Sequence, residues 1–218
     1  MIISMFKIIC VTNRKLCRDD FFERIEKLCK SGISSIILRE KDLSEDGYFE
    51  IAKKAKEICD KNNILLIINS FYKIAEILEN KAVHLPLYIF ENMTDKEKKY
   101  FEIKGVSCHS TKEAAKAEEL GADYIVAGHI FETNCKKGLA GRGISFLEDV
   151  CKAVSIPVYA IGGIDEKNIS QIKKTEASGI CLMSSLMTCK DIDKLVNQLR
   201  KWKFEIQERK SYFICNNR

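Results

Sequence analysis

Proline is scarce in this chain of 218 residues, which contains only two, and no Ser/Gly-rich segment interrupts it. Nothing therefore marks a linker between domains, and a single domain is expected. Long apolar runs are also missing, since none approaches the roughly 18 residues that span a bilayer. The opening residues lack the basic start of a secretory signal. These absences predict a cytoplasmic protein without a membrane partner.

Histidine is scarce as well, and the residues His84, His109 and His129 lack the carboxylate spacing of a metal site. The ten cysteines never form a C-x-x-C pair. Several lie in apolar runs, where cysteine acts as a small hydrophobic residue. Without a secretory signal, this cysteine usage fits a reducing compartment. We expect neither a metal nor a cofactor from these residues.

Charge is present but not concentrated. The formal net charge is +5, with 31% charged and 46% hydrophobic residues, which is ordinary for a globular protein with a large core. Lysines alternate with glutamates along the predicted helix faces. That pattern indicates solvated surfaces, whereas a nucleic-acid-binding protein would cluster its cations. No nucleic-acid partner is expected.

Strand and helix patterns alternate from end to end. Short apolar runs predict eight strands, at residues 6–11, 35–38, 64–68, 82–85, 105–108, 124–127, 157–161 and 179–182. Helical spacing predicts a helix after each strand, at residues 20–30, 44–61, 72–79, 94–101, 110–120, 146–154, 165–174 and 191–202. The expected N-caps are Asp19 or Asp20, Ser44, Thr94, Ser110, Ser145 and Asp191.

Strands this apolar are buried on both faces, as in parallel sheets. Eight such units fit an α/β fold of the single (β/α)8 TIM-barrel class over residues 1–202. A doubly wound open sheet is the alternative. Residues 203–218 show no clear period and are expected to form a tail. In a barrel, function lies on the loops that follow the strands, and this rule places Asn69 and Ser107 on the functional face.

The longest loop, residues 128–143, holds four glycines, a histidine and a cysteine. Loops of this length are usually functional, and we expect this one to form the floor and lid of a site. His129 stands directly after a strand, where an imidazole can transfer protons near neutral pH; the alternative is a purely structural histidine. Lys136 either binds an anion or keeps the loop soluble, and Cys135 is expected to be inert.

Two short segments predict a phosphate site. Gly162 and Gly163 follow the seventh strand, and Ser184 and Ser185 precede a helix after the eighth. Glycines let the backbone approach an anion, and a helix N-terminus offers free N–H groups. Taken alone, the Gly-Gly pair is equally consistent with a simple turn.

Arg39 and Lys41 follow the second strand, where both side chains can turn towards the barrel axis. Two interpretations are open at this point. The pair binds an anionic ligand, or it forms surface ion pairs with Glu40 or Asp42.

These residues resemble the thiamine phosphate synthase superfamily over nearly the whole length. The resemblance rests on the segments LREKD at 38–42, IIN at 67–69, GVSCH at 105–109, GADY at 121–124, PVYAIGGI at 157–164 and MS at 183–184. The resemblance implies a (β/α)8 barrel.

The chain departs from the synthase branch of that superfamily at several positions. The synthase holds magnesium with two aspartates, where this chain has Ser70 and Tyr88. Ile37 replaces a glutamine, and His129 stands where the synthase has proline. Without acidic ligands, magnesium cannot neutralise a pyrophosphate leaving group in the usual way. The synthase reaction is therefore the second expectation.

The loop at 128–143 closely resembles that of TenI-like thiazole tautomerases. This resemblance implies a homodimer in which His129 aromatises a carboxy-dihydrothiazole ethyl phosphate by moving one proton. Ser185 replaces a glycine of those proteins, and Lys41 replaces an arginine. The expected contacts to the thiazole phosphate or its phosphate group are Arg39, Lys41, Asn69, Ser107, Thr133, Lys136, Gly162, Gly163, Ser184 and Ser185. A non-catalytic regulatory or ligand-binding protein is the third expectation.

Overall fold

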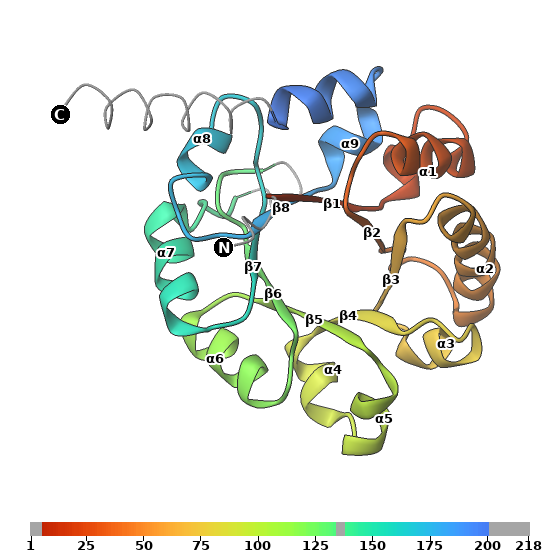
Figure 1. Cartoon of the computed structure of the whole chain (residues 1–218), viewed down its shortest axis with the longest axis horizontal. Coiled ribbons are helices and arrows are strands. Elements are labelled where there is room, and N and C mark those ends of the chain that lie inside the picture. Colours follow the sequence, from red (N-terminus) through yellow and green to blue (C-terminus); the bar gives the residue numbers. More distant parts are fainter. Residues whose placement is uncertain (1–5, 134–137, 201–218) are drawn as a thin grey trace, which may run out of the picture.

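The computed structural model describes residues 6–133 and 138–200. Eight parallel strands close into a barrel in chain order, and β8 pairs with β1 (Figure 1). The strands are β1 (Lys7–Val11), β2 (Ser35–Leu38), β3 (Leu65–Asn69), β4 (Ala82–Pro86), β5 (Ile103–Cys108), β6 (Tyr124–Gly128), β7 (Val158–Ile161) and β8 (Gly179–Leu182). The predicted (β/α)8 barrel is confirmed, and the open sheet is excluded. Cys135, Lys136 and the predicted tail 203–218 lie outside the described residues.

Helices surround the barrel as an outer ring (Figure 1). They are α1 (Phe21–Lys30), α2 (Glu45–Lys61), α3 (Tyr72–Ile77), α4 (Leu87–Asn92), α5 (Asp95–Tyr100), α6 (Thr111–Glu119), α7 (Gly143–Ala153), α8 (Ile169–Ile172) and α9 (Ser184–Thr188), with a short 3-10 helix at Arg14–Leu16. Residues 192–200 are also helical. Within the described ranges, no helix is long and apolar enough to cross a membrane.

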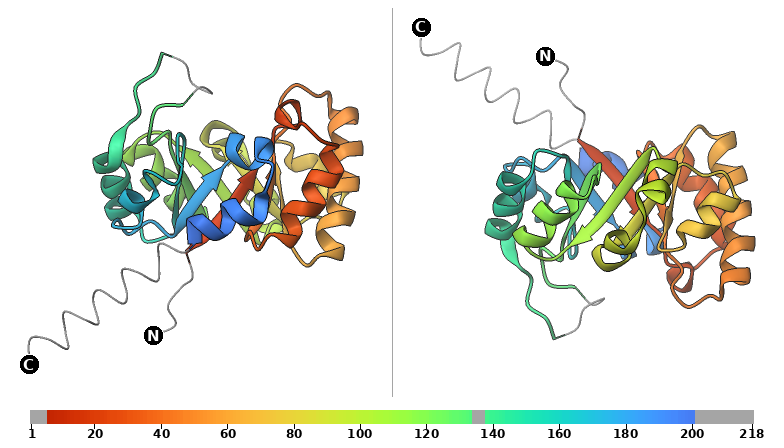
Figure 2. Two further views of the ribbon diagram at one scale, coloured as in Figure 1. Left: turned by 90° about the horizontal axis from the view of Figure 1, so that it is seen from above. Right: turned by 90° about the horizontal axis from the view of Figure 1, so that it is seen from below.

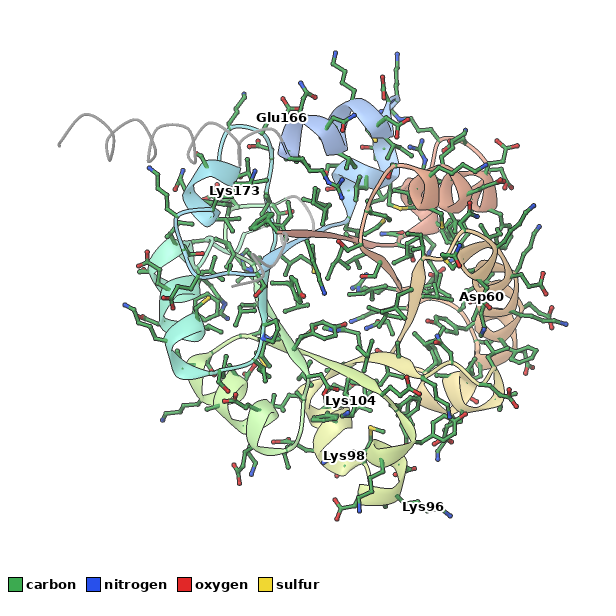
Figure 3. All side chains as sticks on the ribbon, viewed as in Figure 1. Asp60, Lys96, Lys98, Lys104, Glu166 and Lys173 are labelled. Carbon is green, nitrogen blue, oxygen red and sulfur yellow. The ribbon has the colours of Figure 1, made fainter. Side chains whose placement is uncertain are left out.

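Alternation along the strands separates two apolar layers. Outward-facing side chains such as Ile8, Ile36 and Val106 pack against the helices in one large core. Inward-facing side chains such as Val11 and Ile37 fill the barrel itself. Figure 3 shows side chains filling the barrel centre, while charged groups such as the labelled Asp60 and Lys96 lie on the periphery. Burial on both faces explains why the strands are continuous apolar runs.

Several helices begin where their polar caps predict. The side chains of Asp20, Ser44, Thr94 and Ser110 each accept a hydrogen bond from a backbone N–H in the first turn of the helix that follows. Thr94 and Glu97 form a reciprocal capping box. Local sequence therefore fixes these four starts.

Two helices begin at other residues than predicted. Helix α7 begins at Gly143 with Arg142 as its N-cap residue, so Ser145 lies inside the helix. The segment 165–174 contains only the short helix α8. Its beginning is instead a polar turn: Asp165 accepts a hydrogen bond from the backbone N–H of Asn168, and the Asn168 side-chain amide donates 2.7 Å to the carbonyl of Gly163. These side-chain bonds compete with a continuous helix.

Helix α4 was not predicted, because six residues between Pro86 and Met93 are too few to display a helical period. Helix α3 ends at Ile77, two residues short of the predicted Glu79, whose φ of 53° is left-handed. The end of α3 lies on the outer ring, whereas α4 follows β4 directly and so begins at the barrel end that carries the candidate site.

Candidate functional site

The carboxyl ends of the strands carry the predicted site residues. Asn69 and Ser107 lie within β3 and β5, and Arg39, His129 and Gly162 directly follow β2, β6 and β7. The loop after β6 rises beyond this end of the barrel on the side of α7 (Figure 2). The strands thus bring residues far apart in sequence to one end of the barrel, as the fold requires.

His129 is buried, with 6% of its surface exposed. Its Nε2 atom lies 3.3 Å from the backbone carbonyl oxygen of Leu139. A carbonyl only accepts, so this contact assigns the ring proton to Nε2. Nδ1 is then the basic nitrogen of the neutral ring, and it has no hydrogen-bond partner among the described residues. A buried polar atom without a partner requires an explanation, and a catalytic role is one.

The Gly162–Gly163 pair packs directly against the segment that carries His129. Both glycines have positive φ, at 101° and 65°. A Cβ atom at Gly162 would lie 2.8 Å from His129 Cα, and one at Gly163 would lie 2.8 Å from the carbonyl carbon of Phe131. The backbone N–H of Phe131 donates 3.0 Å to the Gly162 carbonyl. The pair is therefore required for this close approach, beyond the needs of a turn.

Backbone hydrogen bonds fix both ends of the long loop. The Arg142 N–H donates 3.0 Å to the His129 carbonyl, and the Gly143 N–H donates 2.9 Å to the Ile130 carbonyl. Thr133 lies half-buried at the start of the loop. The two ends therefore meet at His129, and the predicted role of the loop as a lid stays a prediction.

Arg39 differs from the flanking acidic residues. It shares the inward parity of Ile37, and its backbone N–H donates 2.9 Å to Thr12 Oγ1. Its guanidinium forms no hydrogen bond or ion pair within the described parts of the chain. The predicted alternative, an ion pair from Arg39 to Glu40 or Asp42, is therefore wrong.

Glu40 and Asp42 bind Arg14 instead. Glu40 is 2% exposed and accepts hydrogen bonds from Thr12 Oγ1 at 2.7 Å and from the Arg14 backbone at 3.0 Å. The Arg14 guanidinium donates to both oxygens of Asp42, at 2.6 and 2.7 Å. Hydrogen bonds from Arg14 and Lys15 hold the pKa of Asp42 below its usual range. The loop after β1 thus occupies the carboxylates that flank Arg39. Lys41, by contrast, is exposed.

Asn69 is buried at the end of β3 and is held by two neighbours. Its side-chain amide donates 2.8 Å to the His84 carbonyl. Its backbone N–H donates 3.2 Å to the hydroxyl of Tyr48, which itself donates 2.6 Å to the Leu38 carbonyl. Tyr48, which the sequence reasoning missed, therefore ties the ends of β2 and β3 together. An aromatic residue one turn into a helix gave no signal for this role.

Ser107 is half-buried and lies 2.7 Å from Nε2 of His84 through its hydroxyl oxygen. His84 is 4% exposed, and burial lowers the pKa of His84 to about 3. Its Nδ1 atom lies 3.2 Å from the hydroxyl of Tyr124. Both ring nitrogens of His84 are therefore hydrogen-bonded.

Ser184 and Ser185 begin α9, with Ser184 exposed and Ser185 half-buried. No side chain from the described residues caps this helix. The serine hydroxyls and the first N–H groups are thus left for other partners. The predicted phosphate site consists of this helix start and of the Gly162–Gly163 turn, which follows the neighbouring strand β7. It stays a prediction.

The residues at this end of the barrel do not fit a divalent metal. Ser70 and Tyr88 stand at the two positions where the resemblance places magnesium-binding aspartates, and Tyr88 is 67% exposed. The nearby carboxylates of Glu40 and Asp42 are already paired. In the described part of the chain, no three His, Cys, Asp or Glu side chains are grouped to hold a metal ion.

Comparison with known proteins identifies the family of this chain. A family model described as thiamine monophosphate synthase matches residues 8–186. The chain belongs to this family. It is similar to a thiamine-phosphate synthase of Clostridium tetani, with 36% identity over 87% of this chain and 91% of the relative. A thiamine-phosphate synthase of Fusobacterium nucleatum is also 36% identical, over 89% of this chain and 96% of the relative.

Solved structures agree. A thiamine phosphate pyrophosphorylase from Pyrococcus furiosus superposes with a TM-score of 0.79 and 28% identity, covering 93% of this chain and 98% of that chain. The family model and the sequence relatives thus show the family, and the solved structure shows the same fold. The relatives bear names of synthases, whereas the residues at the barrel end differ from the synthase pattern at the positions described above.

Proposed function

We propose that this member of the family is a thiazole tautomerase, and that it aromatises 2-(2-carboxy-4-methylthiazol-5(2H)-ylidene)ethyl phosphate to the carboxythiazole phosphate. The observation that carries the proposal is the buried His129 ring, whose Nδ1 has no partner among the described residues while Nε2 contacts the Leu139 carbonyl. A reaction that only moves a proton needs one positioned base of this kind.

In the proposed reaction, His129 Nδ1 removes the proton from C2 of the thiazole ring. The electrons of that C–H bond form a C2=N3 double bond, and the N3=C4 double bond moves to C4=C5. The electrons of the exocyclic double bond then move onto the exocyclic carbon. A proton returned by His129 to the exocyclic carbon completes the aromatic product. No atom or electron is gained or lost, and aromatisation makes the step favourable. The ligand must displace the atoms that shield Nδ1 in the structure.

Two anion sites orient the substrate in this proposal. The guanidinium of Arg39 faces the ring carboxylate, with Lys41 as a further cation nearby. The turn at Gly162–Gly163 and the helix start at Ser184 hold the phosphate, as backbone N–H groups do in many barrels. Thr133, Lys136 and the homodimer remain predictions from the resemblance. Holding the two ends of the substrate would fix its C2 atom against the base.

A thiamine-phosphate synthase is the second candidate, and the names of relatives at 36% identity favour it. The experiment gives the protein two separate substrate sets. In one, the dihydrothiazole phosphate is mixed with the protein in the presence of a chelator, and the aromatic absorbance is followed. In the other, thiazole phosphate, a pyrimidine pyrophosphate and magnesium are supplied, and thiamine phosphate is measured.

The proposal predicts fast aromatisation with chelator and no thiamine phosphate in the second mixture. Thiamine phosphate formation without tautomerisation would contradict the tautomerase and support the synthase. If neither product forms while the carboxythiazole phosphate still binds, the regulatory or ligand-binding alternative is supported.

A further inference from the structure

Three residues lie side by side on the neighbouring strands β4, β5 and β6. His84 on β4 pairs with Gly105 on β5, and Gly105 pairs with Tyr124 on β6. A Cβ atom at Gly105 would overlap the Tyr124 ring. Because Gly105 has no side chain, the Tyr124 side chain has room to lie across β5. On the far side its ring stacks on His84, with a centroid separation of 5.6 Å and an interplanar angle of 25°.

The hydrogen of the Tyr124 hydroxyl requires an acceptor, because this side chain is buried. Burial also raises the pKa of Tyr124 well above its ordinary value, so the phenol keeps its proton. Among the described residues, its partner is His84 Nδ1, at 3.2 Å. Nδ1 must then accept, and a neutral imidazole that accepts at Nδ1 carries its proton on Nε2.

The proton on Nε2 of His84 also determines the direction of the hydrogen bond with Ser107. Nε2–H of His84 donates across 2.7 Å to Ser107 Oγ. The hydrogen of the Ser107 hydroxyl is then directed away from His84. Ser107 is half-buried at the barrel end, on the same strand as Gly105. If the tautomer were reversed, the hydroxyl would donate to His84 and present only lone pairs to a ligand.

We propose that Tyr124 is a positioning residue: it fixes the tautomer of His84 and thereby makes Ser107 a hydrogen-bond donor to an anionic oxygen of the ligand. The inference rests on the proposed function only in taking the ligand to be a thiazole phosphate. Both anionic groups of that ligand, carboxylate and phosphate, offer such an oxygen. Sequence reasoning placed Ser107 in the site but gave no role to His84 or Tyr124.

The first test needs no ligand. Two-dimensional ¹H–¹⁵N spectra of the full chain distinguish a protonated from an unprotonated ring nitrogen in His84. The expected result is a proton on Nε2 in the wild type and an added population with the proton on Nδ1 in Tyr124→Phe. Tyr159→Phe is the matched control, because Tyr159 is a buried tyrosine in edge contact with Tyr124. A wild-type His84 protonated at Nδ1 overturns the inference.

The second test measures affinity by calorimetry for two probes, thiazole ethyl phosphate and its 2-carboxylated form. Ser107→Ala is expected to weaken binding about tenfold, the effect of losing one hydrogen bond to a charged group. Tyr124→Phe is expected to weaken it several-fold, and Tyr159→Phe to leave it unchanged. A loss with both probes assigns Ser107 to the phosphate, and a loss with the carboxylated probe alone assigns it to the carboxylate.

The double variant Ser107→Ala/Tyr124→Phe shows whether Tyr124 acts through Ser107. It is expected to bind as weakly as Ser107→Ala alone, since the two changes share one path. Additive losses, or unchanged affinity in Tyr124→Phe, overturn the inference. These outcomes are separate from the proposed function: a protein that binds the probes but does not aromatise the substrate refutes the tautomerase and leaves the tautomer inference standing.

Discussion

Two buried histidines lie in the barrel, and their surroundings differ in one respect. His84, on β4, has a hydrogen-bond partner at each ring nitrogen, Ser107 and Tyr124. His129, after β6, has the Leu139 carbonyl at one nitrogen and no described partner at the other. Burial alone therefore does not distinguish the two histidines. The number of hydrogen-bond partners does, and a buried polar atom left unpaired is costly.

The same contrast holds for charged groups at the barrel end. Glu40 is buried and fully engaged by Thr12 and Arg14. Arg39, its neighbour in sequence, has a guanidinium without a partner in the described chain. The engaged groups hold the loops in place, and the unpaired groups are the ones that we propose bind the ligand. Substitutions of the paired and of the unpaired groups should therefore have different effects.

Apart from substitution of His129 itself, the largest expected effect comes from Gly162→Ala. The added Cβ would lie 2.8 Å from His129 Cα at a φ of 101°, so the His129 segment must shift. A displacement near 1 Å costs roughly 10²-fold in rate. Gly121→Ala is the control, because Gly121 also has positive φ, at 88°, but open space around it. Equal rate losses for both variants would show that backbone strain, and not the His129 contact, is responsible.

His84 is expected to affect stability. Burial lowers the pKa of His84 to about 3 in the folded protein from its ordinary value of 6.5, so the unfolded chain binds more protons between these values. Stability from this group is full above pH 6.5 and is lost as the pH falls towards 3. His84→Gln should reduce that loss, and urea unfolding from pH 7 to 4 measures it. At pH 7 the variant should be less stable by about 1–3 kcal/mol, because its polar neighbours lose their partner. Parallel pH profiles for both proteins would contradict this assignment.

Substitutions of Arg39 and Glu40 should separate effects on KM from effects on stability. They are expected to have the smallest effects of the three. Arg39→Gln is expected to raise KM about tenfold, since one charged contact to the ligand is lost. Its free energy of unfolding should change by less than about 0.5 kcal/mol. Glu40→Gln should do the reverse, lowering stability while KM stays nearly constant. Steady-state kinetics and urea unfolding of both variants test the pair. A large stability loss in Arg39→Gln would mean that it has a structural partner.

Much of the fold follows from the sequence alone. Apolar runs predict the strands because both faces of a parallel barrel are buried, and Thr94 or Ser110 predict helix starts because capping is local. The turn at 165–168 was mistaken for helix, since side chains there compete for the backbone. The rule that strand ends carry function placed Arg39 and His129 at the site.

What the sequence could not predict depends on contacts between distant segments. Glu40 meets Thr12 only after β1 and β2 pair. Gly105 makes room for Tyr124 only once β5 and β6 pair, and Gly162 meets His129 only across β6 and β7. No local period encodes such contacts. They decide which polar groups are paired and which are not.

The central claim is that His129 is the acid–base residue of a metal-independent proton shift. Its most direct test is the rate of aromatisation of the dihydrothiazole phosphate, with chelator present, for the wild type, His129→Ala and His109→Ala. His109 is the matched control because it follows β5 at the same end of the barrel but is far more exposed. The account predicts a loss of about 10²–10⁴-fold for His129→Ala alone. A fully active His129→Ala variant would contradict it.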